Sequence, residues 1–81
     1  MRAQIRGWKY SNSTRKHTIA GHTMDFDNPT KARFVLRQLE LEYDADVKGK
    51  YLIELCIQND IGNWPIHQCF FTDTPIIGLH Q

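Results

Sequence analysis

Residues 28–43 read NPTKARFVLRQLELEY, and this stretch decides the fold class. Asn28 is a favourable N-cap and Pro29 suits the first helical position, so the sequence predicts a helix that begins here. The helix is expected to end near Tyr43, before the loop of residues 44–46. Its apolar residues recur at helical spacing and form one stripe, which is expected to pack on a sheet: Ala32, Val35, Leu36, Leu39 and Tyr43.

Segments rich in strand formers lie on both sides of this helix. Before it, residues 2–10 and 15–26 are separated by the turn formers of residues 11–14, which predicts a β-hairpin. After it, residues 51–58 and 64–71 predict a second hairpin of antiparallel strands. The predicted fold is therefore α+β, a two-layer β-β-α-β-β domain with one helix packed on an antiparallel sheet.

The length and composition of the chain limit what it can do. Its 81 residues correspond to one small domain, residues 1–81, with an irregular tail expected at about residues 73–81. A deep active-site cleft is hard to form in so small a core, so we expect a protein that is not an enzyme. No apolar run near Met1 is long enough for a signal peptide or a membrane span, and the expected location is cytoplasmic, without membrane contact.

The charges are unevenly distributed along the chain. The first 24 residues carry a net charge of +5 with no Asp or Glu, and the remaining 57 carry −4. The early cations are interleaved with aromatic side chains, which suits contact with nucleic-acid phosphates and bases or with an acidic protein surface. The other interpretation is a solvated face with Trp8 in the core. We call this set the basic hairpin: Arg2, Arg6, Trp8, Lys9, Tyr10, Arg15 and Lys16.

The predicted helix has a second apolar face. At 100° per residue, Phe34 and Leu41 fall nearly opposite the buried stripe, on one line of the helix. A helix on a single sheet buries one stripe, so we expect both side chains to be exposed unless the tail residues Ile76, Ile77 and Leu79 cover them. Exposed apolar clusters usually mark contact sites. We call this surface the helix ridge, namely Phe34, Gln38 and Leu41 flanked by Arg33 and Arg37.

The helix charges oppose the helix dipole. Lys31 and Arg33 lie near its positive N-terminus, whereas Glu40 and Glu42 lie near its negative C-terminus. Each such placement forgoes or costs about 0.3–1 kcal/mol on an exposed helix. Either this surface is adapted to something other than the stability of the isolated helix, or the arrangement arose by chance.

The residues that could bind metal do not match a known site. The spacing of Cys56, His67, Cys69 and His80 corresponds to no familiar zinc module. The loop of residues 44–49 begins like a calcium loop, but it lacks oxygen ligands where they are required. We therefore predict no metal and no cofactor.

No catalytic residue is predicted either. Cys69 and His67 are the one nucleophile and base pair worth weighing, and they lack a third group that would orient them. Glu54 lies across from His67 in one register of the second hairpin, which would make a structural pair. Cys56 is expected opposite about Ile66, too far from Cys69 for a disulfide.

These observations favour a small non-enzymatic binding protein that acts by stoichiometric contact with another protein, as an adaptor or an inhibitor. Small phage or mobile-element proteins that inhibit host defence complexes have this size. The alternative is a nucleic-acid-binding module that uses the basic hairpin. A homodimer is also consistent with the sequence, because the basic and acidic regions are complementary and the second helix face is apolar.

Overall fold

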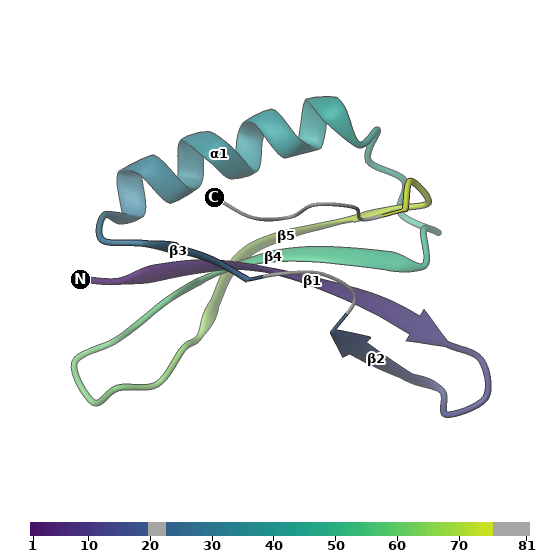
Figure 1. Ribbon diagram of the computed structural model, residues 1–81, viewed down its shortest axis with the longest axis horizontal. Coiled ribbons are helices and arrows are strands. Elements are labelled where there is room, and N and C mark those ends of the chain that lie inside the picture. Colours follow the sequence, from purple (N-terminus) through teal and green to yellow (C-terminus); the bar gives the residue numbers. More distant parts are fainter. Residues whose placement is uncertain (20–22, 76–81) are drawn as a thin grey trace.

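The computed structural model describes residues 1–19 and 23–75, and the predicted α+β fold class is confirmed. One helix lies across one face of an antiparallel sheet (Figure 1). The sheet order is β2-β1-β4-β5, and β3 also pairs with β1. The elements in chain order are β1 (Ala3–Ser11), β2 (Lys16–Ile19), β3 (Met24–Phe26), α1 (Pro29–Glu42), β4 (Tyr51–Ile57) and β5 (Ile66–Thr72).

The predicted strand over residues 15–26 is not continuous, and this part of the prediction is wrong. β2 pairs with the second half of β1, where Trp8 is opposite Ile19, and β3 pairs with the first half, where Ile5 is opposite Met24. From Ile19 to Met24 the chain advances five residues, whereas their partners on β1, Trp8 and Ile5, are only three residues apart. The predicted strand therefore corresponds to two short strands that pair with different halves of β1.

The helix forms where the sequence predicts it, and for the expected reasons. The side chain of Asn28 accepts a hydrogen bond from the backbone N–H of Thr30 at 2.8 Å, which caps the first turn. Pro29 is the first helical residue, and Tyr43 is the C-cap. Asp44 follows with a φ of 50°, the left-handed conformation that ends many helices.

The core lies between α1 and the sheet. α1 contacts β1, β3 and β4, and the predicted stripe is confirmed because Ala32, Leu36 and Leu39 are buried. Val35 and Tyr43 are half-buried and pack against the core. The buried residues of this cluster are Ala3, Ile5, Phe26, Ala32, Leu36, Leu39, Tyr51, Ile53, Leu55, Ile57 and Phe70.

The β4–β5 hairpin has the register expected around Cys56, which pairs with Ile66 next to an irregularity in the ladder. Glu54 pairs with Cys69, so the register that sets Glu54 against His67 is wrong. The irregularity shifts the pairing between Leu55 and Cys56, and such a shift cannot be read from residue types alone.

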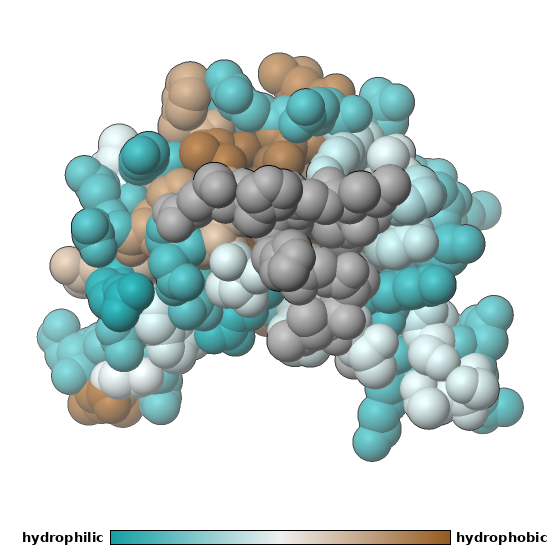
Figure 2. All heavy atoms as spheres, viewed as in Figure 1, coloured by the Kyte–Doolittle hydropathy of each residue, from teal (hydrophilic) through white to brown (hydrophobic). Residues whose placement is uncertain are grey.

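Within residues 1–19 and 23–75, no helix covers the second face of the sheet. β1 and the β4–β5 hairpin extend beyond α1, and the sheet curves away from the helix so that the open face is concave (Figure 1). The space-filling view shows the molecule hollowed between the two hairpin ends (Figure 2). In the part of the chain that the structure describes, no helix has the length and apolarity needed to cross a bilayer.

Candidate interaction surfaces

The helix ridge is exposed, as expected. Phe34 is 63% exposed and Leu41 is 81% exposed, while the buried stripe of α1 faces the sheet. Apolar side chains are visible along the outer side of α1 at the top of Figure 2. Gln38 is also exposed. The tail residues Ile76, Ile77 and Leu79, which would have covered this surface in the other interpretation, lie outside the described residues.

The charges beside the ridge are not neutralised within the described residues. The first turn of α1 holds no acidic residue and the last turn holds no basic one. In residues 1–19 and 23–75, the one ion pair within 4.0 Å joins Arg2 to Asp25, and none involves a charged side chain of α1. Arg33, Arg37, Glu40 and Glu42 are all exposed.

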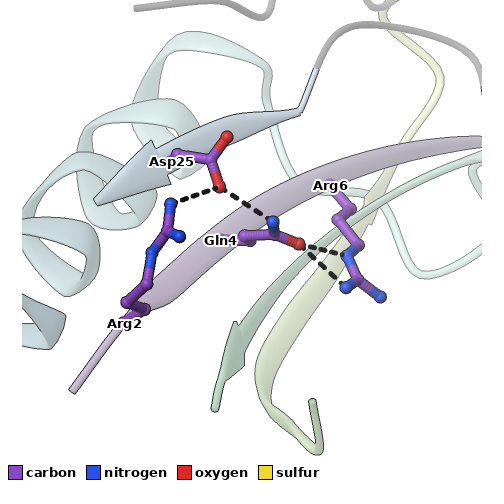
Figure 3. Close-up of polar contacts among 4 residues, drawn as sticks. All are labelled: Arg2, Gln4, Arg6 and Asp25. Carbon is purple, nitrogen blue, oxygen red and sulfur yellow. Dashed lines mark hydrogen bonds and ion pairs between the residues drawn. The ribbon is translucent and has the colours of Figure 1, made fainter. Parts of the chain in front are cut away.

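The basic hairpin is divided into an engaged base and an exposed tip. At the base, Arg2 pairs with Asp25 across 3.6 Å, and the Gln4 amide donates to the same carboxylate oxygen at 2.8 Å. Arg6 donates to Gln4 Oε1 from Nε at 3.0 Å and from Nη2 at 2.8 Å (Figure 3). The guanidinium of Arg6 also lies 5.6 Å from the ring centre of Trp64. Arg2 and Arg6 thus have partners within the chain.

Trp8 is half-buried and held by a specific hydrogen bond. Its indole Nε1 donates to Glu54 Oε1 at 2.6 Å, and Glu54 is only 5% exposed. Trp8 therefore anchors β1 to β4, and its indole N–H is not free for a ligand. Tyr10, two residues further along β1, is also half-buried.

The tip of the basic hairpin is exposed and contains an unusual backbone conformation. Lys9, Arg15 and Lys16 are all exposed. Arg15 has a φ of 55°, and its N–H donates to the Ser11 carbonyl at 2.7 Å, which closes the turn. Glycine adopts this conformation more easily than arginine does, so an arginine here carries a cost in backbone strain.

A cluster on the open face was not predicted from the sequence. Arg6 pairs with Glu54 in the sheet register, and Gln4 pairs with Cys56, so both strands present these side chains on the face away from α1. Cys56 is 1% exposed, and its pKa is raised by burial first and by the charge of Glu54 second, while Arg6 acts in the opposite direction. The alternation of polar residues along β1 was the available signal, but the pairing partner on β4 depends on register.

The cysteine and histidine residues considered as metal ligands or nucleophiles lie in and after the β4–β5 hairpin. Among residues 1–19 and 23–75, no three His, Cys, Asp or Glu side chains could hold one ion. Cys56 and Cys69 are free thiols, the first buried and the second exposed. His67 is exposed on β5, and His80 lies outside the described residues.

Comparisons with protein-family models, with curated proteins and with solved structures found no match to this chain.

Proposed function

We propose that this protein is a non-enzymatic binding protein that acts by stoichiometric contact with another protein, as an adaptor or an inhibitor, through the helix ridge. The observation that carries the proposal is the exposure of Phe34 and Leu41, 63% and 81%, on the side of α1 away from the core. Large apolar side chains gathered on one exposed line mark surfaces that are covered in a complex. The proposed location is the cytoplasm, because two free thiols suit a reducing compartment.

The ridge is also rigid, which favours binding. α1 is capped by Asn28 and fixed to the sheet by Ala32, Leu36 and Leu39, so its outer side chains need little ordering when a partner docks. Arg33 lies beside the apolar line with no ion pair inside the described chain. Its guanidinium can form charge-assisted hydrogen bonds with a partner's carboxylates.

The proposal is tested by a photo-crosslinking residue at position 38 of the full chain in its native cells. Proteins crosslinked there are identified by mass spectrometry, purified and titrated, and the expected stoichiometry is a whole-number ratio. We expect Phe34→Glu or Leu41→Glu to weaken this binding at least about tenfold, since truncating or charging a central anchor costs most of the affinity. Val47→Glu and Ile61→Glu, at exposed apolar positions outside α1, are the matched controls.

Two results would overturn this function. If Phe34→Glu binds as tightly as the unmodified chain, the ridge is not the contact. If the substitution removes the folded circular-dichroism spectrum, Phe34 belongs to the core and its exposure has no functional meaning.

The second candidate function is nucleic-acid binding by the basic hairpin. The observation that favours it is the exposed tip, where Arg15 occupies a conformation better suited to glycine. Against it, Arg2 and Arg6 are engaged within the chain, and the indole of Trp8 is bonded to Glu54.

This candidate predicts a steep dependence of affinity on salt. Binding of a labelled single-stranded oligonucleotide is followed by fluorescence anisotropy at several salt concentrations. The logarithm of the association constant should fall linearly with the logarithm of the salt concentration, with a slope of about −0.7 per phosphate neutralised. Arg15→Glu with Lys16→Glu should remove the binding, and Lys48→Glu, outside the hairpin, is the control. An affinity that is the same at low and high salt excludes this function.

A further inference from the structure

We propose that the partner of the helix ridge is a second copy of this chain, docked α1 against α1 in antiparallel orientation. The two-fold axis of this dimer passes between Arg37 and Gln38. The inference rests on the proposed function in that it takes the ridge to be a contact surface, and it names a second copy of the chain, in place of a different protein, as the occupant.

The apolar residues of the ridge match themselves under this symmetry. Phe34 and Leu41 are equally distant from the point between Arg37 and Gln38, and they lie on one line because seven residues are close to two full turns. Turning one helix about the axis therefore sets Phe34 of each copy against Leu41 of the other. Two identical apolar contacts result, as an isologous interface requires.

The charged residues of α1 are self-complementary under the same axis. At 100° per residue, Lys31 and Glu42 share one flank of the ridge, and Arg33 and Glu40 share the other. The two-fold axis keeps each flank on its own side while it exchanges the helix ends. Each basic residue then faces the acidic residue of its own flank on the second copy, about 3 Å apart along the helix axis.

The centre of the interface contains one contact between like charges. Arg37 of each copy lies beside Arg37 of the other, since the axis passes next to it. Glu40 of the second copy lies on the same flank within one turn, so a carboxylate accompanies each of these two guanidinium groups. Gln38 meets its own copy on the opposite flank, where two amides can exchange hydrogen bonds.

The dimer explains why the charges of α1 oppose its dipole. In one chain, basic residues near the N-terminus and acidic residues near the C-terminus are unfavourably placed, and within the described residues none of them forms an ion pair. In an antiparallel pair, the two helix dipoles attract each other and every such residue gains an opposite charge. An arrangement that is unfavourable in one chain therefore becomes favourable in two.

The shape of the molecule permits this docking. α1 forms the outer layer along its whole length (Figure 1), and its apolar side chains stand at the upper edge of the space-filling view (Figure 2). A helix of this length spans about 21 Å, which makes a contact smaller than the roughly 1,200–2,000 Å² of a standard stable interface. The dimer is therefore expected to dissociate in the micromolar range.

The first test is the mass of the full chain in solution across concentrations from about 1 µM to about 500 µM, which bracket that affinity. Light scattering or sedimentation should show the mass rising from 9.5 kDa towards twice that value. Phe34→Glu should stay monomeric throughout, and Ile61→Glu should behave as the unmodified chain does.

A charge-exchange experiment tests the complementarity. A chain with Lys31→Glu and Arg33→Glu carries acidic residues at positions 31, 33, 40 and 42, and a chain with Glu40→Lys and Glu42→Lys carries basic residues at all four. Each should be monomeric alone, and the two mixed in equal amounts should form a heterodimer. If each variant dimerises alone as well as the unmodified chain does, the charges do not form the interface.

The orientation is tested with single thiols in a Cys69→Ser background, in which the remaining Cys56 is buried. Gln38→Cys and Lys31→Cys lie on the same flank, and a short bifunctional thiol reagent should join two copies at position 38. At position 31 the two thiols of an antiparallel dimer lie about 20 Å apart along the axis and should not be joined. Equal crosslinking at both positions would indicate parallel helices and overturn the proposed geometry.

The outcomes separate this inference from the proposed function. A chain that stays monomeric at every concentration, yet crosslinks from position 38 to a different protein, overturns the second copy as the partner and leaves the ridge as a contact surface. If ridge substitutions change neither self-association nor any crosslink, both proposals fail.

Discussion

Glu54 lies on the face of the sheet that α1 leaves open, yet it is 5% exposed. Trp8 provides its hydrogen bond at 2.6 Å, and Arg6 is its neighbour in the sheet register. A carboxylate is removed from water only where hydrogen-bond donors replace the solvent. The bond from Trp8 on β1 therefore allows the Glu54 carboxylate on β4 to be buried. Because its indole N–H is used in this bond, Trp8 has a structural role in joining β1 to β4.

Trp8→Phe removes the donor and leaves the Glu54 carboxylate buried without it. We expect a loss of about 1–3 kcal/mol in the free energy of unfolding, the cost of an unsatisfied buried acceptor. Urea denaturation followed by circular dichroism measures this. Trp64→Phe is the matched control, because the indole N–H of Trp64 makes no hydrogen bond in the described chain and the phenyl ring still lies under Arg6. Equal losses for both substitutions would mean that ring size, and not the bond, sets the cost.

Cys56 links stability to alkaline pH. Burial and the charge of Glu54 raise the pKa of its thiol, so the folded state resists ionisation more than the unfolded chain does. The stability from this group is complete below the unfolded pKa and is lost as pH rises towards the folded pKa. The free energy of unfolding should therefore fall above about pH 9, by at most about 1.4 kcal/mol per pH unit.

The Cys56→Ala chain is the comparison for this pH dependence. Its stability will be lower at neutral pH, but the part of the alkaline fall that belongs to the thiol should be absent. Chemical denaturation at several pH values between 7 and 11, in both chains, gives the difference. Parallel curves would show that Cys56 ionises as easily in the folded protein as in the unfolded one.

At the scale of the element, α1 combines a well-capped start with charges placed against its dipole. The bond from Thr30 N–H to Asn28 stabilises the first turn, whereas Lys31 near that turn and Glu42 in the last turn destabilise it. A helix optimised for its own stability would exchange the two. This conflict is local, so it can be tested separately from binding.

Lys31→Glu and Glu42→Lys should each raise the stability of the dilute monomer by about 0.3–1 kcal/mol at low ionic strength. The measurement is thermal or urea unfolding at a concentration where no dimer forms, repeated at high salt, which should reduce the gain. Lys48→Glu, outside the helix, is the control and should change little. The same two substitutions should weaken self-association, so stability and association should move in opposite directions. A loss of stability in the dilute monomer would contradict the dipole argument.

At the scale of the whole molecule, the segment after α1 closes the domain against β5. The hydroxyl of Thr72 donates to the backbone carbonyl of Tyr43, and the N–H of Asp46 donates to the Phe71 carbonyl at 2.7 Å. Gly49 then passes so close to Thr72 that an added Cβ would lie 2.2 Å from its carbonyl carbon. The end of the helix, the loop and the edge strand are therefore one packed unit.

Gly49→Ala forces the loop away from β5, because the atoms it meets are backbone and cannot turn aside. We expect a loss of about 2–3 kcal/mol in the free energy of unfolding, typical of overpacking with backbone shifts. Gly62→Ala is the control, since its Cβ would meet open space apart from Gln58 at 4.0 Å and the cost is the strain of a φ of 88°. That strain is about 1–2 kcal/mol. A Gly49→Ala chain as stable as the control would mean that the loop can leave β5 without cost.

The helix ridge was predictable from sequence, whereas the other surfaces were predictable only in part. The positions of Phe34 and Leu41 follow from helical periodicity, which needs only the spacing along one segment. The sequence shows the cations and aromatic residues of the basic hairpin, but its division into an engaged base and an exposed tip depends on Asp25, Glu54 and Trp64, which lie far away in sequence. Residue types alone do not reveal which cations find partners.

The sequence by itself determined what local chemistry can decide: the bounds of α1, the stripe that it buries, the exposed ridge opposite, and the approximate positions of β1, β4 and β5. Helix caps, turns and hydrophobic periodicity depend on residues that are close together in sequence, so they can be predicted from the sequence alone. Only the tertiary structure decided the division of the strand over residues 15–26, the pairing of Glu54 with Cys69 and the burial of Glu54 beneath Trp8. Each of these depends on the register between strands, where a shift of one residue turns every side chain to the other face of the sheet.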